Sequence, residues 1–124
     1  MCAGSLRPDP AEGDIVHLDH RWTAGGVDLS ITFTGVHLLH ASVAACILND
    51  VYREATRLGV PVEGVRVCAG GGFSESWSST GIEYTVEVDS PAEPATVEEL
   101  IAIVDRVAEI PRALRHSAVV TRKP

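Results

Sequence analysis

The sequence predicts an α+β domain with the element order β-β-α-β-β-α-β. Three observations predict this class: a long helix-like segment at 36–58, two pairs of segments with alternating apolar and polar residues, and a second, capped helical pattern. A chain of 124 residues has the length of one domain, which we expect to span residues 14–124. Residues 1–13, dominated by Gly, Pro, Asp and Glu, are predicted to form a flexible leader.

The strand pairs flank the long helical segment. Residues 27–33 alternate cleanly and 15–22 more loosely, and Gly25 and Gly26 between them predict a hairpin turn. After the helix, 62–69 predicts a short strand, followed by a flexible glycine-rich loop that begins at 70–72 and runs to residue 80. Residues 81–89 show the most regular alternation in the chain, which predicts a strand with one buried face.

The long helical segment is apolar almost all round. Between residues 38 and 48 only His40 and Ser42 are strongly polar. A helix without a polar face must be buried on all sides, and a single small domain has little chain with which to cover it. We therefore expect a homodimer that buries this helix against the partner subunit. Gly59 supplies a C-cap, and Pro61 prevents the helix from continuing.

The C-terminal third predicts one more helix and one more strand. Thr96, with Glu99 three residues later, forms a capping-box pattern that predicts the start of a helix. Pro111 is expected to end that helix, because proline cannot continue one. The segment at 118–121 is short and rich in β-branched side chains, and we expect it to form a final strand.

Composition narrows the class of protein. The net charge is −7, from 17 acidic against 10 basic residues without a basic cluster, which argues against a nucleic-acid or anionic-membrane surface. The three cysteines, Cys2, Cys46 and Cys68, are odd in number and lack CxxC spacing, so we expect no disulfide framework and a reducing compartment. No signal-peptide pattern is present and the apolar run is too short for a membrane span, so we expect a cytoplasmic protein.

Cys46 is the first candidate for chemistry, because it lies at the middle of the buried helical segment. Helical spacing places Ser42 one turn before it and Asp50 one turn after it, on the same face. Apolar burial and a nearby carboxylate both raise the pKa of a thiol. A reactive thiolate would therefore need a cation or an imidazole from elsewhere in the chain, and an inert core cysteine is the alternative.

Histidines and aromatic residues are the other candidates. His37 and His40 lie three apart at the helix start, and with His17 and His20 they could in principle meet at zinc. This spacing is much weaker than a zinc-protease motif, so we expect no metal and favour an acid–base role for His37 or His40. Trp77, in the glycine-rich loop, is expected to cover a pocket or to pack on a partner subunit.

Two segments carry a resemblance to a known family. The stretch "HLLHASVAACILNDVYREATRLGVPVEGVRV" resembles the central helix and following strand of the OsmC/Ohr family, the osmotically inducible protein C-like and organic hydroperoxide resistance-like proteins. The later stretch "VDRVAEIPRALRHSAVV" is similar to the second helix of that family and the segment after it. The resemblance, over about 14–122, implies an intertwined homodimer. It also implies two central helices wrapped by antiparallel sheets, with active sites at the subunit interface.

The sequence departs from the family pattern at the positions that carry its peroxidase chemistry. Cys46 matches the peroxidatic cysteine, but Ile110 stands where the resolving cysteine would be. Val36 stands where a glutamate helps to hold the catalytic arginine, for which Arg21 or Arg7 could substitute. The chain therefore does not resemble an intact two-cysteine hydroperoxide reductase.

Three functional hypotheses follow. The favoured one is peroxide or oxidative-stress chemistry at Cys46 in the dimer interface, with an external thiol as reductant and no cofactor. The alternatives are another enzyme chemistry in the same apolar pocket with His37 or His40 as acid or base, and a small-molecule-binding or structural dimer without turnover. The ligand would be a small apolar molecule or a hydroperoxide. Its expected binding residues are Ser42, Asn49, Asp50 and Trp77.

Overall fold

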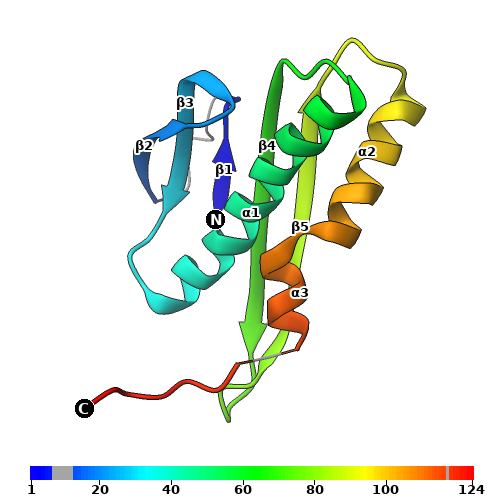
Figure 1. The fold of residues 1–124 in the computed structure, drawn as a ribbon. Helices are drawn as coiled ribbons and strands as arrows, with labels where there is room; N and C mark the ends of the chain where they lie inside the picture. The colour runs from blue at the N-terminus through cyan, green and yellow to red at the C-terminus, as the bar shows by residue number, and fades with distance from the viewer. Residues whose placement is uncertain (7–12, 117) are drawn as a thin grey trace.

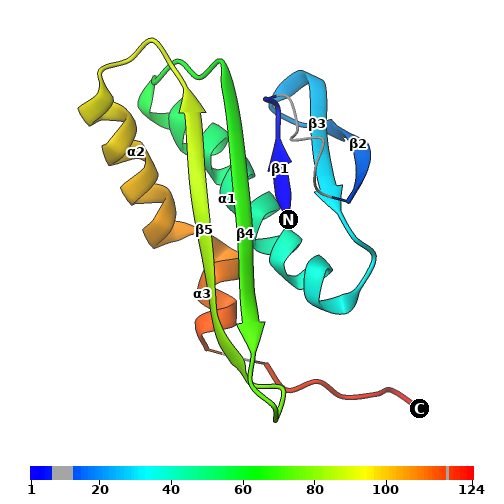
Figure 2. The ribbon, with the colours of Figure 1, turned by 180° about the vertical axis from the view of Figure 1, so that it is seen from behind.

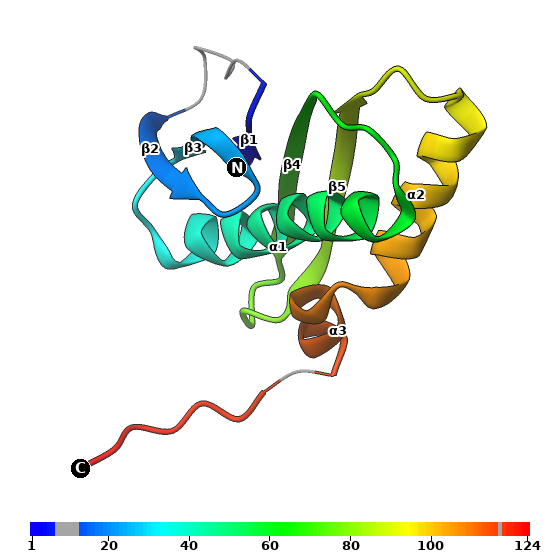
Figure 3. The same cartoon turned by 45° about the horizontal axis from the view of Figure 1, so that its top comes forward.

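The structure, a computed structural model, describes residues 1–6, 13–116 and 118–124, and it confirms the α+β class. Five antiparallel strands form one sheet in the order β2-β3-β1-β4-β5, and α1 lies across one face of it (Figures 1 and 3). The elements are β1 (Cys2–Gly4), β2 (Asp14–His20), β3 (Thr23–Ile31), α1 (Gly35–Leu58), β4 (Gly64–Phe73), β5 (Ser79–Asp89), α2 (Pro94–Val107) and α3 (Glu109–Arg115).

Helix α1 forms where the sequence predicts it. Thr34 caps its N-terminus by accepting a hydrogen bond from the backbone N–H of His37, and Gly59 ends it in the left-handed conformation at φ 71°. The middle of α1 packs on β4 and fills the core with Ile47 and Val51, both fully buried. Among the described residues, no helix combines the length and the hydropathy that crossing a membrane requires.

The glycine-rich segment at 70–72 is not a flexible loop, as the sequence analysis expected, but part of β4. It pairs with β5 along its whole length. A Cβ on Gly71 would collide with the backbone oxygen of Gly81 on the neighbouring strand, so the missing side chain permits this close pairing. The connecting turn lies at 74–78 instead, and Trp77 adopts φ 62° in it.

The prediction of a flexible leader over residues 1–13 is wrong for its first residues. Residues Cys2–Gly4 form β1, which lies between β3 and β4 in the middle of the sheet. The structure also overturns the expectation of unpaired thiols, because Cys2 lies opposite Cys68 and forms a disulfide with it. Sequence spacing could not show this pairing, which joins residues 66 positions apart. Residues 7–12 of the predicted leader, including Arg7, lie outside the described residues.

The first hairpin turns earlier than predicted. Its turn falls at Arg21 and Trp22, whereas Gly25 and Gly26 lie inside β3. The ladder between β2 and β3 shifts register between Leu18 and His20. Gly26 lies in this irregular part of the ladder and has φ 74°, a left-handed conformation that favours glycine.

The C-terminal part also differs from the prediction. Helix α2 begins at Pro94 after Glu93, so Thr96 lies within the first turn instead of capping it. Proline suits the first helical position, because its missing N–H has no partner there. Pro111 does not end a helix but lies in the first turn of α3. Residues 118–121 form no strand and lead away from the body of the molecule (Figure 1).

Candidate functional site

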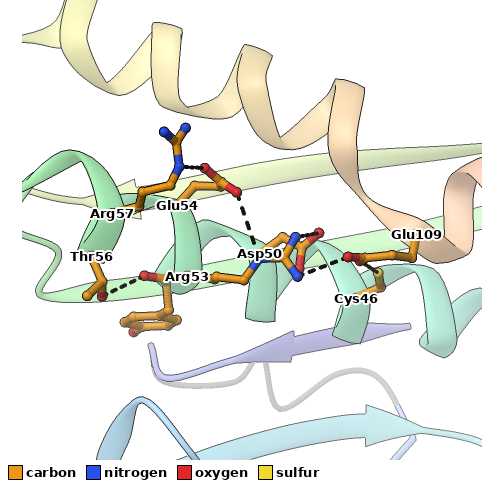
Figure 4. A network of polar contacts seen from close by, with 8 residues as sticks. Cys46, Asp50, Arg53, Glu54, Thr56, Arg57 and Glu109 are labelled. Atoms are coloured by element: carbon orange, nitrogen blue, oxygen red, sulfur yellow. Dashed lines mark hydrogen bonds and ion pairs between the residues drawn. The ribbon is translucent and has the colours of Figure 1, made fainter.

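Cys46 is the free cysteine of the described residues, and it lies half-buried in the middle of α1. Its Sγ donates a hydrogen bond to Oε2 of Glu109 at 3.7 Å (Figure 4). Glu109 is the first residue of α3, and the extended backbone of Ala108 (φ −59°, ψ 125°) separates α3 from α2. This break redirects the chain so that the start of α3 faces the centre of α1.

Arg53 joins the thiol site to a buried carboxylate. Its guanidinium binds Glu109 at 2.9 Å and Asp50 at 3.1 Å, and it lies 3.8 Å from Glu54 (Figure 4). Cys46, Asp50 and Arg53 follow the spacing i, i+4, i+7, which puts them on one face of α1. The result is a connected network of a thiol, carboxylates and one shared cation.

Burial and nearby charges shift the pKa values of the two carboxyl groups in this network in opposite directions. Asp50 is 3% exposed, and burial, followed by the nearby carboxylate of Glu109, raises its pKa from 3.8 to about 6 although Arg53 opposes the shift. The hydrogen bond from Arg53 lowers the pKa of the exposed Glu109. Near neutral pH, Glu109 is therefore an ionised acceptor, while Asp50 is close to its titration point and can carry a proton.

The thiol itself is held in its neutral form. Burial raises the pKa of Cys46, and the charges of Asp50 and Glu109 raise it further. Hydrogen bonding from the backbone of Ile110 opposes this shift. The site therefore differs from one in which a cation stabilises a thiolate, and the Glu109 carboxylate is the acceptor that lies beside the thiol proton.

The same three side chains form a potential metal-ligand set. One ligand atom from each of Cys46, Asp50 and Glu109 lies within 4.8 Å of the others. Arg53 already neutralises both carboxylates at hydrogen-bond distance. A metal ion would have to compete with that guanidinium, so the donor set does not favour a resident cation.

The structure does not bring the predicted histidines to Cys46. His37 lies in the first turn of α1, where its Nδ1 hydrogen-bonds to Thr34 at 2.6 Å. His40 is buried against Phe73, and its Nε2 finds no partner among the described residues. Burial is the main cause that lowers the pKa of His40. Six positions separate His40 from Cys46, which places the two on different sides of the helix.

The other predicted residues are also dispersed. Ser42 donates to the backbone of Leu39, which satisfies its hydroxyl locally. Asn49 accepts from His20 on β2 and lines a hollow of about 190 Å³ between α1 and the first hairpin. Trp77 is exposed at the tip of the β4–β5 hairpin. Arg21 stacks on Trp22 in the turn after β2. Of the predicted binding residues, only Asp50 contacts the thiol network.

Sequence reasoning missed Arg53 and Glu109. Arg53 lies seven residues after Cys46, so two helical turns place both on one face, and this spacing could have been noticed. Glu109 had no such signal, because it is separated from Cys46 by 63 residues and is placed by the break between α2 and α3.

Fold and site together define an α+β protein with a thiol–carboxylate site on its central helix. The sequence profile of OsmC-like proteins matches residues 26–123, and the chain belongs to this family. Among solved structures, an OsmC-like protein from Mycoplasma pneumoniae is similar at 16% identity, with TM-score 0.63 and coverage of 86% of this chain and 89% of that one.

A second solved structure supports the same fold. An OsmC-like hydroperoxide resistance protein from Jannaschia sp. CCS1 is similar at 16% identity and TM-score 0.52, with coverage of 75% of this chain and 69% of that one. Comparison with curated proteins gave no match. At these identities the structural neighbours show a shared fold, and family membership rests on the profile match.

Proposed function

We propose that the protein reduces hydroperoxides through Cys46 in a one-cysteine mechanism. The observation that carries this proposal is the contact from the Cys46 thiol to the ionised carboxylate of Glu109. Membership of the OsmC-like family supports it, as does the structural neighbour described as a hydroperoxide resistance protein. Arg53 binds Glu109 at 2.9 Å, and in this proposal it is a positioning residue for that carboxylate.

The first half-reaction follows from the protonation states of the site. Glu109 accepts the proton of Cys46, and the thiolate attacks the terminal oxygen of the hydroperoxide. The O–O bond breaks and the electron pair leaves with the alkoxide. Asp50, with its pKa near 6, supplies the proton that makes this leaving group an alcohol. The products are a Cys46 sulfenic acid and one alcohol.

The second half-reaction requires an external thiol, because Ile110 occupies the resolving position. One thiol attacks the sulfenic sulfur and releases water, which leaves a mixed disulfide on Cys46. A second thiol then displaces Cys46 and carries away the disulfide. Two thiols are thus oxidised for each hydroperoxide reduced.

We also propose that the functional unit is a homodimer. Phe33, immediately before α1, is 90% exposed, and Ile15, Val16 and Leu18 of β2 are between 42% and 49% exposed. Strand β2 and the connection from β3 to α1 lie at the N-terminal half of α1 (Figure 3). A second copy that covers this surface would bury these side chains together with Leu38 of α1, which is 43% exposed in one chain. Sedimentation equilibrium that finds a stable monomer at micromolar concentration would remove this part of the proposal.

The experiment that tests the proposed chemistry combines hydroperoxide treatment with intact-mass measurement. Wild-type protein treated with an organic hydroperoxide should gain oxygen at Cys46, and the Cys46→Ser variant should gain none there. The Glu109→Gln variant should react about a hundredfold more slowly at neutral pH, because the loss of the proton acceptor outweighs the lower thiol pKa that follows from removing one negative charge. Thr96→Ala, on α2, serves as the control. An unmodified Cys46 under excess hydroperoxide would refute the proposal and leave the histidine-dependent and binding hypotheses.

A further inference from the structure

The Cys2–Cys68 disulfide lies on the face of the sheet opposite α1. Residues alternate between the two faces of a strand, and Val65, Val67 and Ala69 of β4 are the ones buried in the core. Cys68 therefore points the other way, and so does Cys2, because its neighbour Ala3 also belongs to the core. No helix of the described residues covers this face at β1 and β4 (Figure 2).

Both half-cystines open into one hollow. The hollow has a volume of about 450 Å³ and is open to solvent, and its lining includes Cys2, Cys68 and Arg66. Arg66 precedes Cys68 by two positions on the same face of β4. Glu83 of β5 lines the hollow as well, and Glu87 of β5 lies 4.0 Å from the Arg66 guanidinium. A small molecule can thus reach the sulfur atoms in the folded protein, beside the Met1 ammonium, the Arg66 guanidinium and two carboxylates.

We propose that Cys2–Cys68 is a second redox site, which exchanges with low-molecular-weight thiols in the native protein. It is separate from the Cys46 network and does not rest on the function proposed above. A small thiolate attacks Sγ of Cys2 and forms a mixed disulfide, and Cys68 leaves as a thiolate. A second small thiol then displaces Cys2 and departs as the small-molecule disulfide. Two electrons pass from the two thiols to the protein, which ends with two free cysteines.

The direction of attack follows from the charges around the disulfide. A thiolate leaves faster when its pKa is low, and a nearby guanidinium lowers the pKa of a thiol. Arg66 shares a strand and a face with Cys68 and so favours Cys68 as the leaving group, while the Met1 ammonium lines the same hollow and assists the departure of either sulfur. Glu83 and Glu87 work in the opposite sense, because a negative charge disfavours both the leaving and the incoming thiolate.

Reduction changes how β1 is held. The disulfide is the covalent link between β1 and β4, and it closes a sequence separation of 66 residues. Without it, this strand of three residues is retained by its ladders to β3 and β4, by the packing of Ala3 in the core and by the hydrogen bonds of Met1 and Ser5. Because β1 joins the β2–β3 hairpin to the β4–β5 hairpin, its release would loosen the connection between the two halves of the sheet.

The test measures thiol exchange in folded protein. A Cys46→Ser background leaves only Cys2 and Cys68 to report. This variant is incubated with fixed ratios of 2-mercaptoethanol and the disulfide of 2-mercaptoethanol. Samples are alkylated at intervals and analysed by intact-mass spectrometry. We expect reduction without unfolding, reversal when the small disulfide is in excess, and faster hydrogen exchange of β3 and β4 amides in the reduced form.

Substitutions of the charged residues beside the disulfide distinguish a redox site from a purely structural disulfide. Arg66→Gln should slow reduction by about threefold to tenfold, and Arg66→Lys should restore most of the rate. Glu83→Gln should accelerate reduction by a similar factor. If the substitutions only loosened the sheet, Arg66→Gln and Glu83→Gln would change the rate of reduction in the same direction. Any of three results would overturn the proposal. Cys2 and Cys68 could be free thiols after purification without reductant, or the disulfide could be reduced only in denaturant. The rate of reduction could also be the same in wild type, Arg66→Gln and Glu83→Gln.

Discussion

Replacement of Asp50 by asparagine provides a direct test of the charge distribution in the Cys46 site. Asp50 is buried, and its pKa is raised from 3.8 to about 6, with burial as the main cause. Asparagine has nearly the same shape but cannot ionise. The difference in stability between the two proteins therefore reports the free energy of ionising this carboxyl group inside the fold.

The expected magnitude follows from the shift in pKa. A shift from 3.8 to about 6 at about 1.4 kcal/mol per unit corresponds to about 3 kcal/mol. Because the folded state binds this proton more tightly than the unfolded state, the contribution of Asp50 is most favourable below pH 3.8. It is lost as the pH rises toward 6 and stays lost above that value. The stability of Asp50→Asn relative to wild type should thus rise by about 3 kcal/mol between pH 3.8 and pH 7.

Urea unfolding at a series of pH values measures this difference. The free energies of unfolding of wild type and Asp50→Asn are compared at each pH, with Asp89→Asn as the control. Asp89 lies exposed at the end of β5, so its replacement controls for the general effect of exchanging one carboxylate for an amide. A difference between Asp50→Asn and wild type that stays constant from pH 3.8 to 7 would refute the inference that Asp50 is protonated easily in the folded protein.

Three further variants test the position of Ile110, the core around Ile47 and the close pairing of β4 with β5. Ile110→Cys should form a disulfide with Cys46 on hydroperoxide treatment, because the Ile110 backbone lies against that thiol; intact mass should show two hydrogens lost, and oxygen gain alone would contradict this. Ile47→Ala should lower the free energy of urea unfolding by about 3 kcal/mol, since this side chain is fully buried; a loss under 1 kcal/mol would contradict its core position. Gly71→Ala should lower the melting temperature, because its Cβ would collide with the β5 backbone; an unchanged melting temperature would contradict that close approach.

Carboxylates lie beside Cys46 where a thiolate-stabilising cation would be expected. Arg53 is present, but it binds Asp50 and Glu109 in place of the sulfur. The consequence is a neutral thiol with a proton acceptor beside it. Direct loss of the Cys46 proton to solvent would need a pH above the range of an ordinary cysteine, because the pKa of this thiol is raised, and the proposed reaction therefore passes the proton to Glu109.

Local signals in the sequence determined the central elements. The predicted helix at 36–58 corresponds to α1 (Gly35–Leu58), and the predicted strand at 81–89 lies within β5 (Ser79–Asp89). Both predictions depend on periodicity over many residues and, for α1, on a glycine cap. These features act through neighbours a few residues apart, so the chain itself displays them. Membership of the OsmC-like family, suggested by two motifs, is confirmed as well.

Tertiary structure alone decided the N-terminal strand, the cysteine pairing and the reactive site. Strand β1 has three residues, too few to show a period, and it forms because β3 and β4 offer their edges on both sides. The Arg53–Glu109 ion pair joins residues 56 positions apart, and the break between α2 and α3 places it. The sequence by itself specified the central helix and its cysteine. Which charges surround that cysteine depended on distant segments meeting in space, because electrostatic contacts follow distance and not sequence order.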